Sequence, residues 1–265
     1  MAGGSSQPGR GVLDRVSAIL AAFERERRPL SMTEIAERAQ LPMSSAHRLI
    51  NDLVEHGLLN RTPDNRYQAG LRLWRLGQSV GQQLRETAHP HVQDLYSLTG
   101  ETSHLAIRDG REVLYIFRFY GTKRVARSSW TGGRLPLHST AVGKVILAFE
   151  EEWVRSAFLE LHMPRSTRNT IDDPATLAAE LVRIREQGYA TTFEEQRLGT
   201  CSIAVPIFHT GRIGAGLGLV LSADRYSSLC RYLPTLQAVS QRIEKATAHI
   251  PLESLLESGR LGERS

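Results

Sequence analysis

Four polar side chains gather at the front of one short segment, residues 41–59 (LPMSSAHRLINDLVEHGLL). The apolar residues of this segment recur at the three- and four-residue spacing of a half-buried helix. Its other face begins with two hydroxyls, an imidazole and a guanidinium, at Ser44, Ser45, His47 and Arg48. Such groups bind phosphates and base edges, and an Arg fork matches O6 and N7 of guanine. A solvated helix face would carry the same residues, so the cluster alone leaves both interpretations open.

The residues around this helix indicate which domain carries it. Residues 11–26 form an amphipathic helical pattern, and Ser31 with Glu34 has the spacing of a capping box that begins a second helix. Gly57 ends the helix with the polar cluster. The following residues alternate around a TPDN turn, which predicts a β-hairpin. Three short helices and a hairpin within residues 11–70 are typical of a winged helix-turn-helix domain.

In that domain the polar segment is the recognition helix, whose front end enters the major groove of double-stranded DNA. Arg61 and Arg66 flank the hairpin tip, where they suit phosphates or the minor groove. A dimer would contact two half-sites roughly 34–36 Å apart or a multiple of that distance, so we expect a palindromic operator and salt-dependent affinity. The expected DNA-binding residues are Ser44, Ser45, His47, Arg48, Asn51, Arg61 and Arg66.

The remaining chain divides into a linker, a second domain and two tails. Residues 71–88 form an amphipathic helical pattern, which we interpret as a linker that touches a partner subunit. Pro90 is expected to mark a boundary, and residues 89–252 mix strand and helix patterns as an α+β domain. The flexible tails are residues 1–10 and 253–265.

Composition excludes several classes of protein. The 265 residues carry a formal net charge of +5 with a pI of about 9.5, which is compatible with an acidic partner. The two cysteines show no metal-ligand spacing, so we expect no metal, no other cofactor and no disulfide framework. No apolar run reaches membrane-spanning length, and the first residues lack the apolar core of a signal peptide. We therefore expect a cytoplasmic protein with no membrane contact.

A candidate anion site lies in the second domain. Ser139 and Thr140 precede a short helical pattern, so the backbone N–H groups near Ala141 and Val142 are expected at a helix N-terminus. The positive end of the helix dipole and its unbonded N–H groups bind anions, and a carboxylate suits this position.

Four segments resemble the IclR-type bacterial transcriptional regulators. LPMSSAHRLINDLVEHGLLNR and YQAGLRLWRLG are similar to the DNA-binding half of that family; GGRLPLHSTAVGKVILA and IREQGYATTFEEQRLGTCSIAVPIFHTG resemble its effector-binding half. The resemblance implies a winged helix-turn-helix, a linker helix used in dimerisation, a C-terminal GAF-like ligand-sensing domain, and a homodimer or tetramer. It also favours repression of transcription over activation. This chain departs from the family at Thr192, where Asp or Ser is usual, and at His209, where Asp or Asn is usual.

The resemblance also implies which residues line the effector pocket. Thr192 and Ser202 would supply hydroxyls, although hydroxyls satisfied within the core are an equal alternative. Gly218 and Val220 share one strand face and are small and apolar, so the pocket floor is expected to be wide and apolar. The expected effector is a small organic acid, its carboxylate on the helix end near Ala141 and its apolar or aromatic body over this floor.

Two rival functions remain at this point. A thiol-dependent GAF-like enzyme would use Cys201, and it would need an activated thiolate. A DNA-binding protein without an effector would leave the large second domain unexplained.

One of Arg124 and Arg127 is also expected to point into the effector pocket, and strand parity leaves open which one.

Overall fold

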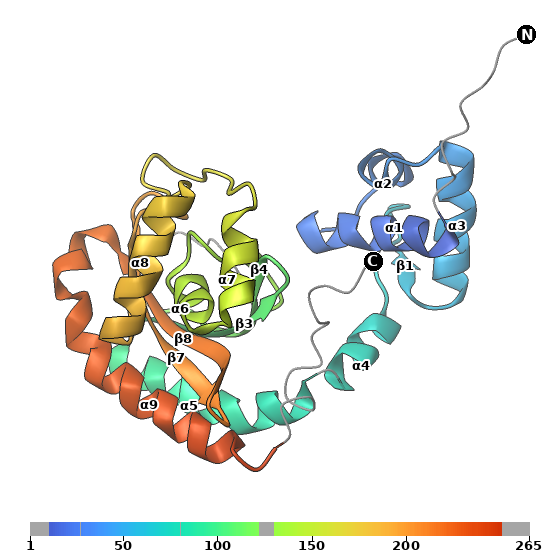
Figure 1. Cartoon of the computed structure of the whole chain (residues 1–265). Coiled ribbons are helices and arrows are strands. Elements are labelled where there is room, and N and C mark those ends of the chain that lie inside the picture. The colour runs from blue at the N-terminus through green and yellow to red at the C-terminus, as the bar shows by residue number, and fades with distance from the viewer. Residues whose placement is uncertain (1–10, 27, 80, 122–129, 251–265) are drawn as a thin grey trace, which may run out of the picture. The chain divides into compact units, whose positions relative to one another are not determined.

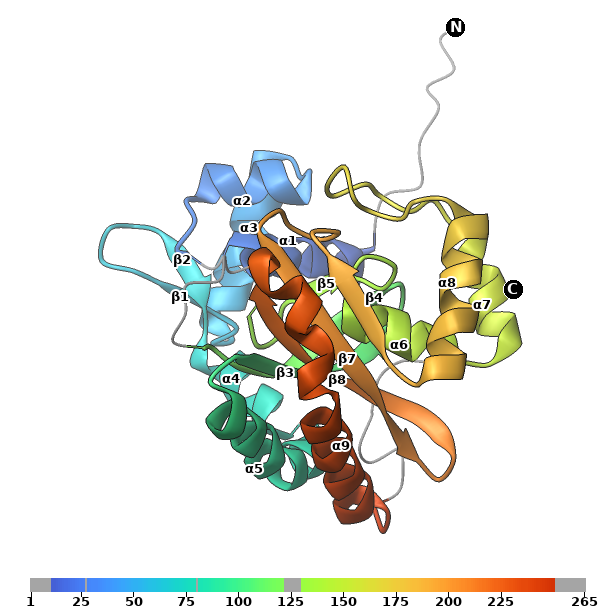
Figure 2. The same cartoon turned by 90° about the vertical axis from the view of Figure 1, so that its left-hand side faces the viewer.

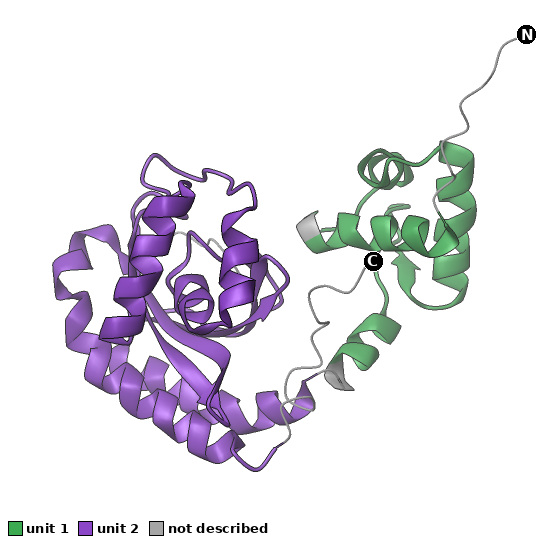
Figure 3. Cartoon of the chain, in the orientation of Figure 1, with its two compact units in different colours: residues 1–80 green, residues 81–265 purple. Residues whose placement is uncertain are grey.

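The structure is a computed structural model of the whole chain, and it divides into two compact units, residues 1–80 and 81–265 (Figure 3). Both tails and the two arginines Arg124 and Arg127 lie outside the residues that it describes. The described residues are 11–26, 28–79, 81–121 and 130–250.

The first unit is a three-helix cluster with a hairpin. Ile19, Ile35 and Ile50, one from each helix, are fully buried and meet in its core. The two strands pair antiparallel, with Asn60 opposite Gln68. The expected winged helix-turn-helix is therefore confirmed (Figure 1). Its elements are α1 (Val12–Glu26), α2 (Met32–Ala39), α3 (Met43–Glu55), β1 (Leu59–Arg61), β2 (Tyr67–Ala69) and α4 (Leu71–Ser79).

The capping box at the start of α2 is present and also holds the hairpin. Oγ of Ser31 accepts from the N–H of Glu34 at 3.2 Å, and the Glu34 carboxylate accepts from the N–H of Ser31 at 2.8 Å. Arg66 donates to the same carboxylate at 3.3 Å, and backbone bonds join Leu30 to Tyr67. These bonds hold the hairpin against the N-terminal end of α2.

The linker differs from the expected single helix over residues 71–88. Helix α4 ends at Ser79, and α5 (Gln82–Thr99) begins after Gly81, whose φ of 57° is left-handed and breaks the helix. The boundary expected at Pro90 is wrong, because α5 continues through that residue. The buried side of α5, which includes Ala88 and Val92, holds the helix against the sheet despite the missing proline N–H.

The second unit is built on one six-stranded antiparallel sheet with the order β5-β4-β3-β8-β7-β6. The mixture of strands and helices expected within residues 89–252 is confirmed. The strands are β3 (Thr102–Asp109), β4 (Glu112–Phe119), β5 (Arg134–Pro136), β6 (Ala190–Phe193), β7 (Thr200–His209) and β8 (Arg212–Ser222).

Helices cover both faces of this sheet, and each face has its own apolar core (Figure 2). Residues such as Leu95 and Leu217 fill the core under α5 and α9, while Val145 and Ile184 fill the core under α6 and α8. Immediately before Pro234, η1 gives way to α9. The remaining helices are α6 (Ala141–Phe149), α7 (Glu152–Leu159), α8 (Pro174–Gln187), η1 (Ala223–Tyr232) and α9 (Leu233–Thr247). None of the described helices is long and apolar enough to cross a membrane.

Helix α6 begins in very close contact with the chain that precedes it. Thr140 is the N-cap residue and its Oγ1 accepts from the N–H of Gly143 at 3.1 Å. A Cβ on Gly143 would lie 2.2 Å from the carbonyl oxygen of Leu137 and 2.6 Å from Oγ1 of Thr140. Only glycine therefore permits this tight turn into the helix.

We predict that Gly143→Ala prevents the second unit from folding or strongly lowers its thermal stability, by more than about 3 kcal/mol, because backbone atoms cannot give way to the added methyl. Circular dichroism during heating measures the effect. Gly77→Ala in α4 is the matched control, since no atom lies within 4 Å of the added Cβ. A Gly143→Ala protein that melts at the wild-type temperature would contradict this description of α6.

Candidate functional site

The exposed face of α3 carries the polar cluster that the sequence singled out. Ser44, His47 and Arg48 are exposed, while Ala46 and Leu49 on the opposite side are buried. Ser45 is half-buried, at the edge of this face. The helix therefore presents its polar front to solvent and packs its apolar side on the rest of the unit.

Further along α3, Asn51 is exposed and its Nδ2 lies 3.2 Å from Nδ1 of His47. On the hairpin, Arg61 is exposed and donates to the side chain of Asn65 in the turn. Both side chains are accessible, as a contact with DNA would require.

Arg66 differs from the other predicted contacts because it is half-buried and already bonded within the unit. It donates to the backbone carbonyl of Pro29 and to the Glu34 carboxylate, both at 3.3 Å. Bonds from Arg28 and from Ser31 hold the pKa of Glu34 at about 2. Arg66 thus positions the hairpin, a role that its place beside the turn did not reveal.

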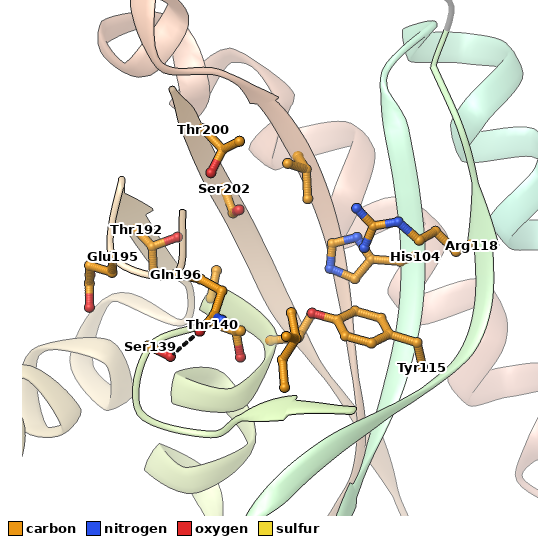
Figure 4. A pocket seen from close by; sticks show the side chains of 14 residues that line it. His104, Tyr115, Arg118, Ser139, Thr140, Thr192, Glu195, Gln196, Thr200 and Ser202 are labelled. Atoms are coloured by element: carbon orange, nitrogen blue, oxygen red, sulfur yellow. Dashed lines mark hydrogen bonds between the residues drawn. The ribbon is translucent and has the colours of Figure 1, made fainter. Parts of the chain in front are cut away.

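The second unit contains a polar pocket between the sheet and the start of α6, partly open to solvent (Figure 4). Its lining combines groups from the α6 entrance, from β6 and β7, and from β3 and β4. The lining residues are His104, Tyr115, Arg118, Leu135, Ser139, Thr140, Ala141, Val142, Thr192, Glu195, Gln196, Thr200, Ser202 and Val220.

One side of the pocket is formed by hydroxyls and the helix end. Thr192 and Ser202 are register partners on β6 and β7, and Ser202 in turn pairs with Val220 on β8. Ser139, immediately before the N-cap residue, donates to Oε1 of Gln196 at 2.6 Å. Five of the expected effector-binding residues, Ala141, Val142, Thr192, Ser202 and Val220, are thus brought together around one pocket.

Gly218, the sixth, is not among the lining residues, because the ring of His104 covers it. The two are register partners on β3 and β8, and a Cβ on Gly218 would lie 2.8 Å from Nε2 of His104. The expectation of a wide apolar floor is wrong, since the ring occupies the space that glycine leaves. Ten of the fourteen lining residues are polar, so the pocket suits a polar ligand.

The opposite side of the pocket is formed by Arg118, His104 and Tyr115, which sequence reasoning missed (Figure 4). Arg118 and His104 are register partners on β4 and β3, and only 8% and 2% of their surfaces are exposed. The Arg118 guanidinium lies 5.5 Å from the centre of the Tyr115 ring. Burial, followed by the Arg118 charge, holds the pKa of His104 well below its usual range, so its imidazole is neutral.

A β-bulge places Tyr115 on this side. The pairing shifts between Leu105 and Ala106, so that Leu105 faces Phe117 while Ala106 faces Tyr115. Strict alternation would direct residues 115 and 118 to opposite faces, but the extra residue in β4 returns them to the same face.

A buried ion pair lies at the edge of the pocket. Lys144, in the second turn of α6, has no exposed surface, and its Nζ lies 2.6 Å from Oε1 of Glu195 and 3.8 Å from a carboxylate oxygen of Glu180. Burial raises the pKa of Glu195, and the Lys144 charge opposes that shift. The sequence held one signal of this pair, a single lysine within the apolar run AVGKVILAF.

Other residues that the sequence singled out lie in the core. Cys201 is fully buried, its Sγ contacts the carbonyl oxygen of Ser222 at 3.1 Å, and burial raises the pKa of its thiol to about 11. A thiol held protonated in this way does not support the enzyme alternative. His209 is also buried, and its Nε2 lies 2.7 Å from the carbonyl oxygen of Ile250, which fastens β7 to the end of α9. Within the described residues, no cluster of His, Cys, Asp and Glu is arranged to hold a metal.

Comparisons with known protein families match both units. Residues 12–63 match the sequence model described as the IclR helix-turn-helix domain, and residues 78–245 match the one described as the bacterial transcriptional regulator IclR C-terminal domain. The HTH-type transcriptional regulator XynR of Escherichia coli is 33% identical over 249 residues, 89% of this chain and 97% of XynR. The HTH-type transcriptional regulator KdgR of the same organism is 32% identical over 242 residues, 87% of this chain and 92% of KdgR.

Solved structures show the same similarity. An IclR homologue from Microbacterium hydrocarbonoxydans, crystallised with 4-hydroxybenzoate, is 30% identical and superposes with a TM-score of 0.82 over 89% of this chain and 98% of its own. The Thermotoga maritima IclR is 33% identical, with a TM-score of 0.72 over 89% of this chain and 98% of its own.

We predict that Lys144→Met destabilises the second unit by about 3–5 kcal/mol at neutral pH, because it leaves the Glu195 carboxylate buried without its partner. Burial already raises the pKa of this carboxyl in the folded state, and loss of Lys144 raises it further. The penalty is therefore absent below the pKa of the unfolded carboxyl, grows as the pH rises from that value toward the folded pKa, and is constant at higher pH.

Urea unfolding between pH 5 and pH 8 measures this penalty. The double variant Lys144→Met, Glu195→Leu, which removes both charges, should recover most of the loss. Equal stability of Lys144→Met and wild type at pH 8 would show that the pair does not hold α6 in place.

Proposed function

This chain belongs to the IclR family of bacterial transcriptional regulators, and we propose that it is a repressor whose operator binding is altered by a small organic acid. The observation that carries the DNA-binding part is the exposed polar front of α3 on a confirmed helix-turn-helix unit. Repression is supported by the resemblance and by the DNA-binding transcriptional repressor YiaJ of Escherichia coli, which is 31% identical over 202 residues. Because DNA is its partner, we place the protein in the cytoplasm.

In this proposal α3 enters the major groove with its N-terminal end. Arg48 donates two hydrogen bonds to O6 and N7 of a guanine, and Ser44 and Ser45 bind phosphates or base edges. His47 and Asn51 contact the DNA further along the groove. Arg61 and Arg66 approach the backbone from the hairpin, where Arg66 also keeps the hairpin attached to α2.

We propose that the protein binds a palindromic operator as a homodimer, or as a tetramer built from two dimers. Helix α4 supports this, because Leu71, Trp74 and Leu76 are 73%, 64% and 56% exposed. Large apolar side chains gathered on one short helix are typical of a surface covered by a partner.

The proposed effector site is the polar pocket of the second unit. The carboxylate of the acid lies on the N–H groups of Ala141 and Val142, at the N-terminus of α6. Thr192 and Ser202 donate hydrogen bonds, and Val220 contacts the apolar body. Gly218 acts through the His104 ring that covers it. The 4-hydroxybenzoate in the Microbacterium relative supports an aromatic acid as the first ligand to test.

The acid alters DNA binding only if it binds one dimer geometry better than another. We propose that it favours a geometry in which the two recognition helices no longer match the half-site spacing. The segment around Gly81, between α4 and α5, would carry that change.

We predict that the purified protein, incubated with sheared genomic DNA, enriches a few fragments that share an inverted repeat. On such a fragment, Arg48→Ala should weaken binding by about 1–3 kcal/mol and relax the preference for one guanine. Arg183→Ala on the exposed side of α8 is the matched control. Equal affinity of Arg48→Ala and wild type, in a gel-shift titration at fixed salt, would exclude Arg48 from base recognition.

We also predict that 4-hydroxybenzoate lowers the affinity for this fragment at least about fivefold, which is the lower range of allosteric coupling. 4-Hydroxybenzamide has the same shape without the negative charge, so it should have little effect. Fluorescence anisotropy with labelled DNA measures both. An unchanged affinity at all concentrations of the acid would contradict an aromatic acid as effector.

A further inference from the structure

The effector contacts proposed above include no hydrogen bond to Arg118 or His104, which form one side of the pocket. We infer that these two residues bind a hydroxyl group of the effector, at the end remote from its carboxylate. This inference rests on the proposed function and narrows the effector to hydroxy acids. It also makes Arg118 and His104 the residues that determine specificity.

The position of Arg118 and His104 supports this inference. Arg118 on β4 and His104 on β3 are register partners, and both line the pocket. Figure 4 shows them on the side opposite Thr140 and Ser139, which lie at the entrance of α6. A ligand anchored at the helix end therefore extends toward them.

One nitrogen of His104 lacks a hydrogen-bond partner. Nδ1 of His104 is fully buried and has no hydrogen-bond partner in the protein. Only 2% of the residue's surface is exposed, so solvent does not replace that partner. A buried polar nitrogen without a partner costs about 1–3 kcal/mol. The ring is locked in place because Gly218 lies directly beneath it and Tyr115 stands edge-on at 5.2 Å. A ligand atom at Nδ1 would remove that cost.

His104 and Arg118 offer different hydrogen-bonding roles to a ligand. The His104 imidazole is neutral, so one ring nitrogen carries no hydrogen and accepts a bond. The Arg118 guanidinium only donates. A hydroxyl fits both, because it accepts from Arg118 and donates to His104 Nδ1. A methyl group fits neither.

The test compares 4-hydroxybenzoate with 4-methylbenzoate, which have nearly the same shape and share the carboxylate. Isothermal titration calorimetry on the full-length protein should show at least about tenfold tighter binding of the hydroxy acid, the value expected for a hydrogen bond to a charged group. Arg118→Met should reduce that ratio to near one and leave the affinity for 4-methylbenzoate close to wild type.

Two further variants complete the test. His104→Phe keeps a ring over Gly218 while removing both nitrogens, and it should also bring the ratio close to one. Arg134→Met, on the neighbouring strand β5 and outside the pocket lining, should keep the wild-type ratio. If Arg118→Met does not fold, the wild-type ratio and His104→Phe decide the question.

The outcomes separate this inference from the function on which it rests. If both acids bind and shift DNA affinity but the wild type does not distinguish them, the hydroxyl subsite is wrong and the organic-acid effector stands. If Arg118→Met weakens both acids equally, Arg118 binds the carboxylate and the inferred orientation is overturned. If neither acid binds the wild type, the aromatic-acid proposal fails and this inference fails with it.

Discussion

The ammonium of Lys144 is buried with no exposed surface, and the architecture of the second unit depends on how that charge is compensated. Its 2.6 Å contact with Glu195 joins the second turn of α6 to the loop that follows β6. Removing either partner would leave the other charge uncompensated in the interior. The pair therefore fixes two parts of the pocket wall relative to each other: the helix end with Ala141 and Val142, and the loop with Gln196.

A second constraint acts on the opposite wall and depends on the absence of a side chain. Because Gly218 has no Cβ, the His104 ring can lie on β8 and meet Arg118 on the next strand. The bulge in β4 adds Tyr115 to the same face. Gly218, which in the sequence suggested an open apolar floor, instead leaves room for the polar His104 ring on this side of the pocket.

Local patterns in the sequence predicted most of the fold. The helical spacing of α3, the capping box at Ser31 and Glu34, and the alternation in the sheet strands are signals contained within a few residues of each other. Five pocket residues could also be named: Ala141 and Val142 from the pattern of a helix N-terminus, and Thr192, Ser202 and Val220 through the resemblance to a known family. The continuation of α5 through Pro90 could not be foreseen, because packing on the sheet outweighs the local cost of proline.

The polar walls of the pocket depend on contacts between distant parts of the chain. Lys144 and Glu195 are 51 residues apart, and nothing near either one announces the other. Residues 115 and 118 share a face only because of a bulge, which strand alternation cannot predict. Sequence alone therefore located the pocket and misjudged its chemistry.

In the proposed mechanism, DNA and an organic acid bind to linked sites of the same protein. The most direct test is to measure by calorimetry the affinity for 4-hydroxybenzoate of the free protein and of the protein saturated with its selected DNA fragment. Linkage requires the DNA to weaken acid binding by the same factor by which the acid weakens DNA binding. We predict that the two factors are equal and that each is about five or more. Equal acid affinity for the free and the DNA-bound protein would contradict the claim.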